Sequence, residues 1–113
     1  MKSWNLLDIE APGGTVDPVV LDSQETRAVL IAFTPGQELG DHQVKERAWL
    51  VVVDGAVTVD SDEGGPLEAG PGTLMAFAPN ERHSVASAGG ARILLLLAPW
   101  PGEGHYRGEE KEL

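Results

Sequence analysis

Cysteine is absent from the 113 residues of this chain. Disulfides, thiolate metal sites and a cysteine nucleophile are therefore excluded. Positive charge is also scarce, because 8 Lys and Arg residues face 18 Asp and Glu residues, which gives a formal net charge of −10. A field of that sign repels phosphate backbones and anionic lipid surfaces, so we expect neither a nucleic acid nor a membrane as a partner.

Long hydrophobic runs are missing as well. The longest apolar run, residues 93–99, is much shorter than the roughly 20 residues that a membrane-spanning helix needs, and no apolar targeting segment follows Met1. We therefore expect a cytoplasmic protein. The length is that of one ordinary domain, so residues 1–113 are treated as a single domain.

Glycine and proline are abundant, with 14 and 8 residues, and they interrupt every stretch long enough for a regular helix. Short apolar runs lie between these turn residues, and several are rich in β-branched side chains, which favours strands. Such a series of short strands predicts an all-β sandwich or barrel. The expected strands are 19–21, 26–33, 48–53, 56–60, 73–77, 83–86 and 91–98.

Two of the intervening turns carry specific expectations. Asp54-Gly55 lies between two β-branched runs and predicts a tight type I′ hairpin. The acidic run Asp60-Ser61-Asp62-Glu63 is placed in a second hairpin turn, and it lacks the ligand spacing of a calcium-binding loop.

Two longer segments carry a pattern of glycines and histidines at fixed spacing. The first runs from Gly36 through His42 to Gly55, and the second runs from Gly72 to His83. Their spacing resembles the two signature motifs of the cupin superfamily. The resemblance implies an antiparallel jelly-roll β-barrel made of two sheets.

The same resemblance divides the chain into three parts. They are a barrel core at 19–99, an N-terminal arm at 1–18 and a C-terminal tail at 100–113. It also implies that the chain forms a homodimer.

The motifs of the family supply four metal ligands, namely two His and one Glu from the first motif and one His from the second. This chain keeps His42 and His83, but Val44 stands at the position of the other His and Ala48 at that of the Glu. Neither side chain can donate an electron pair to a metal. Asn80 replaces a glycine of the second motif, and Asn tolerates the left-handed backbone that a turn can require.

Strand alternation predicts which side chains face the barrel interior. If His42 points inward, every second residue after it shares its side, and His83 and Val85 share a face on the later strand. Two imidazoles, one carboxylate and aliphatic walls are typical of a small-molecule pocket. The expected pocket is lined by His42, Val44, Glu46, Ala48, Leu50, His83 and Val85.

Three functions agree with this pattern, and the sequence leaves open whether the chain is an enzyme. The first is a barrel that binds a small organic ligand beside the two histidines, without catalysis or with an unassigned activity. The alternative is a metal-dependent enzyme of the oxygenase or isomerase type. In it His42, His83 and either Glu46 or water would hold a divalent ion of Zn, Fe, Ni or Mn. The third is a sensor or assembly module that acts through its dimer surface.

Two further aromatic residues are candidates for contacts outside this pocket. Trp49 is expected to point out of the barrel, where a second copy of the chain, another sheet layer or the N-terminal segment would cover it. His105 follows the last expected strand in a loop rich in Gly and Pro. A lone loop histidine is usually solvated, unless the loop folds back over the barrel mouth.

Overall fold

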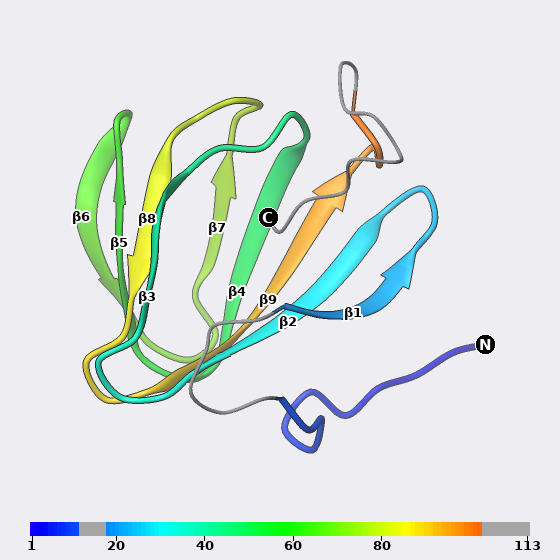
Figure 1. The fold of residues 1–113 in the computed structure, drawn as a ribbon, viewed down its shortest axis with the longest axis horizontal. Coiled ribbons are helices and arrows are strands. Elements are labelled where there is room, and N and C mark those ends of the chain that lie inside the picture. The colour runs from blue at the N-terminus through cyan, green and yellow to red at the C-terminus, as the bar shows by residue number, and fades with distance from the viewer. Residues whose placement is uncertain (12–17, 103–113) are drawn as a thin grey trace.

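Nine strands form the part of the chain that this computed structural model describes, residues 1–11 and 18–102 (Figure 1). No helix long and apolar enough to cross a membrane occurs in that part. The strands are β1 (Val19–Ser23), β2 (Arg27–Phe33), β3 (Glu38–His42), β4 (Arg47–Gly55), β5 (Val57–Ser61), β6 (Gly64–Ala69), β7 (Leu74–Phe77), β8 (His83–Ala86) and β9 (Ala91–Ala98).

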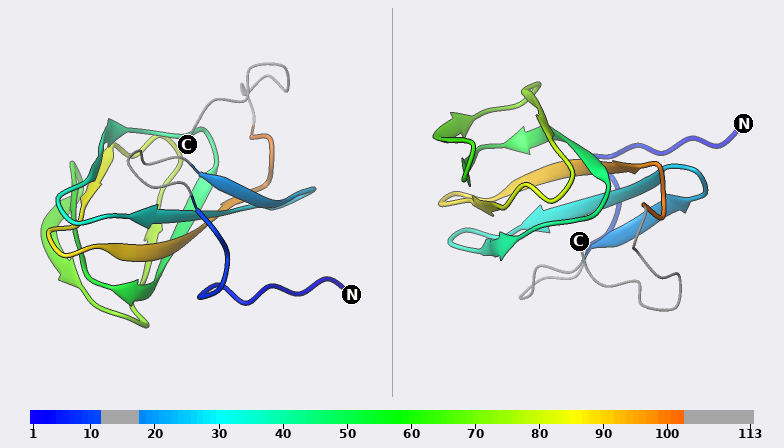
Figure 2. Two further views of the ribbon diagram at one scale, coloured as in Figure 1. Left: turned by 60° about the horizontal axis from the view of Figure 1, so that its bottom comes forward. Right: turned by 90° about the horizontal axis from the view of Figure 1, so that it is seen from above.

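The strands form two antiparallel sheets that face each other (Figures 1 and 2). The larger sheet has the order β1-β2-β9-β4-β7, and the smaller sheet has the order β3-β8-β5-β6. Neighbouring strands are often far apart in the sequence, as in the pairing of β2 and β4 with β9. The prediction of an all-β jelly roll is confirmed.

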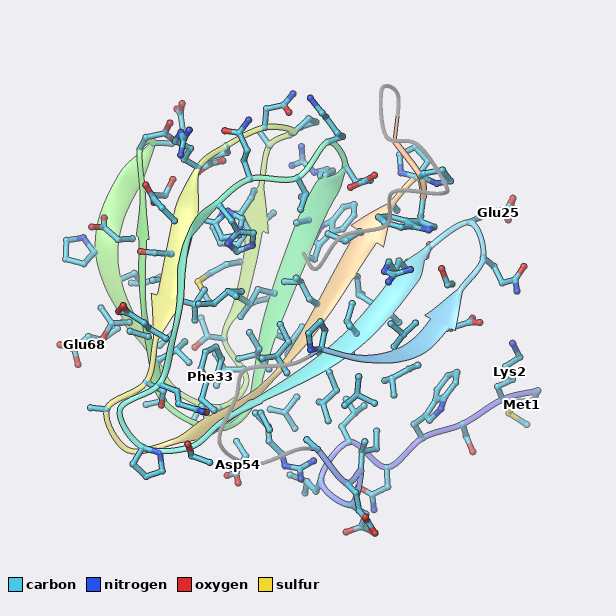
Figure 3. The ribbon with its side chains drawn as sticks, viewed as in Figure 1. Met1, Lys2, Glu25, Phe33, Asp54 and Glu68 are labelled. Carbon is cyan, nitrogen blue, oxygen red and sulfur yellow. The ribbon has the colours of Figure 1, made fainter. Side chains whose placement is uncertain are left out.

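Side-chain alternation builds the core between the two sheets. In β4, Ala48, Leu50 and Val52 are buried, and the intervening residues are half-buried or exposed. The inner faces of β2 and β9 contribute in the same way, with Phe33 at the end of β2 (Figure 3). Because burial of apolar surface drives folding at about 25 cal/mol per Å², this shared interior holds the two sheets together.

The prediction of a hairpin at Asp54-Gly55 is wrong. β4 pairs with β7 and β9, whereas β5 pairs with β6 and β8, so this turn carries the chain from one sheet to the other. Asp54 lacks the positive φ that a type I′ turn requires, while Gly55 has φ +75°. A Cβ at Gly55 would lie 2.2 Å from the carbonyl oxygen of Gly90, so only glycine fits this crossing.

The hairpin expected at the acidic run is present, but only the second half of the run lies in its turn, because Asp60 and Ser61 belong to β5. β5 and β6 pair from Val57 and Ala69 to Ser61 and Gly64, which leaves Asp62 and Glu63 in the turn. β6 itself and β3 were not among the expected strands.

The two terminal segments pack on the barrel. In the N-terminal arm, the carbonyl oxygen of Leu6 accepts a hydrogen bond of 2.8 Å from Nη1 of Arg92 on β9. At the other end, Trp100 is buried, its backbone N–H donates to the carbonyl oxygen of Glu25 at 2.8 Å, and the Arg27 guanidinium lies 4.5 Å from its ring centroid. Residues 100–102 therefore belong to the packed body, and His105 lies outside the described residues.

Trp49 lies on the face of β4 opposite to the core. It is half-buried, and the Arg47 guanidinium carbon lies 5.7 Å from its ring centroid. The outward orientation expected for this residue agrees with the burial of its neighbours Ala48 and Leu50.

Candidate functional site

The pairing of β3 with β8 brings the two histidines together. His42 and His83 are direct register partners, although 40 residues separate them in the sequence. Their ring centroids lie 4.3 Å apart, with the planes inclined at 61°, so that one ring meets the other by its edge. The smaller sheet therefore places both imidazoles at one point inside the barrel.

A backbone carbonyl lies beside Nδ1 of each ring. Nδ1 of His42 lies 3.1 Å from the Gly40 oxygen, and Nδ1 of His83 lies 3.1 Å from the Glu81 oxygen. Because a carbonyl oxygen can only accept, each Nδ1 carries a proton, and in the neutral form of each ring the lone pair is therefore on Nε2. Both Nε2 atoms are buried, and neither has a hydrogen-bond partner among the described residues.

His83 is the more deeply placed of the two rings, with 1% of its surface exposed. Burial lowers its pKa below the ordinary value of 6.5, the hydrogen bond to the Glu81 carbonyl opposes that shift, and the nearby His42 adds to it. Phe77 stacks on the same ring, with centroids 4.1 Å apart and planes 12° apart. The environment thus keeps His83 neutral.

The other residues expected in the pocket occupy different surroundings. Ala48, Leu50 and Val85 belong to the buried core, and Val44 is half-buried against it. Glu46 is buried, and its Oε2 accepts a 2.6 Å hydrogen bond from the backbone N–H of Gly102. The C-terminal segment is therefore the partner of this carboxylate, a contact that strand alternation alone does not reveal.

Among the described residues, the histidine pair supplies only part of a metal site. Two imidazoles with ring centroids 4.3 Å apart and buried, unpartnered Nε2 atoms have the donor type that a transition metal takes in two of its ligand positions. Within residues 1–11 and 18–102, however, no group of three or more His, Asp or Glu side chains is close enough to hold an ion. Glu46 does not join the histidines in such a group, so the described residues do not fit a complete metal site.

The turn of the second motif is held by its own hydrogen bonds. Asn80 has φ +66°, the left-handed conformation expected for a residue that replaces glycine, and its N–H donates to the Val44 oxygen at 2.8 Å. Glu81 accepts from the Ala78 N–H at 2.9 Å and from the Ser61 hydroxyl. The bonds from Ser61 and Ala78 lower the pKa of Glu81, which keeps it ionised.

A groove of about 260 Å³, which we call the β6–β7 groove, opens between residues of β5, β6 and β7. None of the seven residues expected in the pocket lines it. The inward alternation of Met75 and Phe77 on β7 is the sequence signal that points to it, but its other wall comes from β6, which the sequence does not predict. The groove is lined by Val59, Leu67, Met75 and Phe77, with Ser61, Glu63 and Glu81 as its polar residues.

Known proteins share the sequence pattern and the fold of this chain. Residues 29–98 match the family model described as cupin domain. That segment includes both histidines and both glycine-containing motifs. None of the curated proteins compared with the chain matches it.

Solved structures share the fold at low sequence identity. An RmlC-like cupin protein from Desulfovibrio desulfuricans is 25% identical with a TM-score of 0.75, over 88% of this chain and 97% of that one. A conserved protein with a double-stranded β-helix domain from Klebsiella pneumoniae is 16% identical with a TM-score of 0.77, over 90% and 93% of the two chains. A cupin superfamily protein from Desulfitobacterium hafniense is 18% identical with a TM-score of 0.72, over 80% and 83%.

Proposed function

The chain belongs to the cupin domain family, and on that premise we propose that it is a binding barrel for a small organic ligand beside His42 and His83. The ligand carries a hydrogen-bond donor, a hydroxyl or an amine, that points at the two Nε2 atoms. Since His42 is half-buried and His83 is fully buried, the ligand approaches from the side of His42. Fold alone does not specify a function, so the proposal rests on the chemistry of this pair.

One observation carries the proposal: the two imidazoles have buried Nε2 atoms that no described residue satisfies, and Nδ1 of each ring faces a backbone carbonyl, so Nε2 is the acceptor of each ring in its neutral form. A buried polar atom without a partner costs about 1–3 kcal/mol, so a group that satisfies both atoms is favoured. A carboxylate offers no proton to either atom, and the pKa of His83 is lowered, which disfavours the imidazolium that would attract an anion. A ligand group that donates hydrogen bonds is therefore the group that matches the two Nε2 atoms.

The test is a screen of hydroxyl- and amine-bearing fragments, read by the ¹⁵N shifts of the histidine rings. A ligand that donates to the pair is expected to shift the Nε2 resonances of His42 and His83 and to leave their Nδ1 resonances nearly unchanged. His42→Phe keeps a ring of similar size and removes the acceptor, so it should abolish the response. Binding that leaves both Nε2 resonances in place, or turnover of the fragments at ordinary enzymatic rates, contradicts the proposal.

A metal-dependent enzyme of the oxygenase or isomerase type is the second candidate. It is supported by the same two Nε2 atoms, which suit Zn, Fe, Ni or Mn, and it requires ligands beyond the histidine pair. Elemental analysis after expression with added metal decides it. Less than about a tenth of an equivalent of bound metal removes this candidate, since complete sites bind tightly.

We further propose that the chain forms a homodimer through the outer face of its larger sheet. Apolar side chains line this face on neighbouring strands, because Val51 is the register partner of both Leu74 and Leu94, and Trp49 is that of Leu96. Leu74 is 61% exposed in the isolated chain. A second copy that covers this face removes apolar surface from water, which is the usual driving force for such contacts.

A further inference from the structure

The β6–β7 groove borders the histidine pair at Phe77, and most of its walls are apolar. Val59 and Phe77 are buried at its base, Met75 is half-buried, and Leu67 on β6 is 47% exposed. The ring of Phe77 stands between the groove and His83, on which it stacks. The volume of about 260 Å³ exceeds the about 150 Å³ of a cavity that admits benzene, so one ring with a short chain fits.

The ionisable side chains that line this groove are the carboxylates Glu63 and Glu81. Glu81 is fixed in place by the hydrogen bonds from Ser61 and Ala78, and Glu63 belongs to the turn between β5 and β6. A carboxylate can accept more than one hydrogen bond on each oxygen, so Glu81 retains acceptor capacity. None of the described residues that line the groove is Lys or Arg.

We propose that the β6–β7 groove is a second binding site, which takes an organic cation with an apolar body. The apolar part would lie against Val59, Met75 and Phe77, and an ammonium group would lie near Glu63 and Glu81. The net charge of −10 attracts such a cation from a distance and repels an anion of the same shape. This site goes beyond the proposed ligand of the histidine pair, because it uses other residues and another kind of charge.

Titration with 2-phenylethylammonium, followed by amide chemical shifts, tests the proposal. We expect saturable shifts confined to the segments 59–67 and 74–81. The neutral isostere 2-phenylethanol should bind several times more weakly, and the anion 3-phenylpropionate should produce no saturable shift. Equal binding of the three compounds, or saturable shifts only outside these segments, overturns the proposal.

Matched variants separate charge from shape. Glu63→Gln removes one exposed carboxylate of the groove and should weaken binding of the ammonium roughly two- to fivefold, as for other exposed ion pairs. Glu68→Gln is the control with the same change of net charge, since Glu68 on β6 points away from the barrel (Figure 3) and does not line the groove. Equal effects of the two variants overturn the assignment of Glu63.

A second pair of variants introduces a lysine, in one variant inside the groove and in the other outside it. Leu67→Lys places an ammonium beside Glu63 and should abolish binding of the probe. Val20→Lys is its control, because Val20 on β1 is 46% exposed, close to the 47% of Leu67, and lies outside the groove. His42→Phe should leave the titration unchanged, so failure of the histidine-site proposal and failure of this one give different results. Unchanged binding by Leu67→Lys overturns the proposal.

Discussion

The ring of Phe77 lies flat against the imidazole of His83, with 12° between the two planes. The side chain of Phe77 also lines the β6–β7 groove. One side chain therefore forms the common wall of the two proposed sites. Substitutions at Phe77 would disturb both sites, whereas substitutions at Glu63 and Leu67 change the groove alone.

The buried position of His83 predicts a pH dependence of stability. Its pKa is lowered in the folded protein, so below about pH 6.5 the unfolded chain binds more protons than the folded one. The free energy of unfolding should therefore fall as pH drops below 6.5, by at most about 1.4 kcal/mol per pH unit for this group. Urea denaturation between pH 7 and pH 5 measures the slope.

The matched variant for this experiment is His83→Gln, which cannot titrate in that range. Its slope between pH 7 and pH 5 should be smaller than that of the original chain. A slope that is equal in both proteins would assign the dependence to other groups. The lowered pKa of Glu81 acts in a separate window, because the stability it contributes is present above pH 4.5 and is lost as pH falls below that value.

The crossing between the two sheets predicts unequal effects of two glycine substitutions. Gly36 and Gly55 both have positive φ, but a Cβ at Gly36 meets nothing within 4 Å, whereas at Gly55 it meets the Gly90 oxygen at 2.2 Å. Gly36→Ala should cost about 1 kcal/mol from backbone conformation alone. Gly55→Ala adds a backbone collision and should cost roughly 3 kcal/mol or more. Similar losses in urea denaturation would mean that the crossing relaxes easily.

The positive φ of Asn80 predicts a third stability effect, which should differ in size between two substitutions. Its φ of +66° is tolerated by Asn, free of strain for Gly and unfavourable for Ala. Asn80→Ala should lower the free energy of unfolding by about 1 kcal/mol, whereas Asn80→Gly should leave it nearly unchanged. Thermal and urea unfolding measure both variants. An Ala variant as stable as the original chain would show that this turn adopts another backbone conformation.

The proposed dimer predicts that one exposed leucine controls assembly. Leu74→Glu places a carboxylate on the outer face of the larger sheet and should weaken association at least roughly tenfold, as for central interface positions. Val20→Glu is the control, because Val20 is the register partner of Val29, whose side chain faces the core. Sedimentation equilibrium distinguishes monomer from dimer. A monomeric original chain, or equal association of both variants, contradicts the proposed face.

The resemblance of the two motifs to those of the cupin superfamily identified the fold and implied that His42 and His83 belong to one site, and the pairing of β3 with β8 brings the two residues together. It missed β3 and β6, whose segments contain Gly40 and Gly64-Gly65-Pro66 and have low strand propensity. These strands form through pairing with β8 and β5, a tertiary effect that local sequence does not record.

The prediction of a hairpin at Asp54-Gly55 was wrong because the local sequence does not show which strands pair. A glycine with positive φ suits a hairpin and a crossing between sheets equally well, and only the partners of β4 and β5 distinguish the two. The sequence also did not predict the contact of Glu46 with Gly102, which are 56 positions apart. The donor is a backbone N–H, and because every residue except proline carries one, nothing in the sequence distinguishes Gly102 as the partner.

The position of β9 in the larger sheet governs the order in which the molecule can assemble. β9 is the last strand in the described part of the chain, yet it lies between β2 and β4 and supplies the backbone hydrogen bonds that both require. During synthesis, the apolar faces of β2 and β4 stay without this partner until residues 91–98 have left the ribosome. Non-local pairing of this kind slows folding, and the unpaired edges of β2 and β4 are open to association with other chains during that interval.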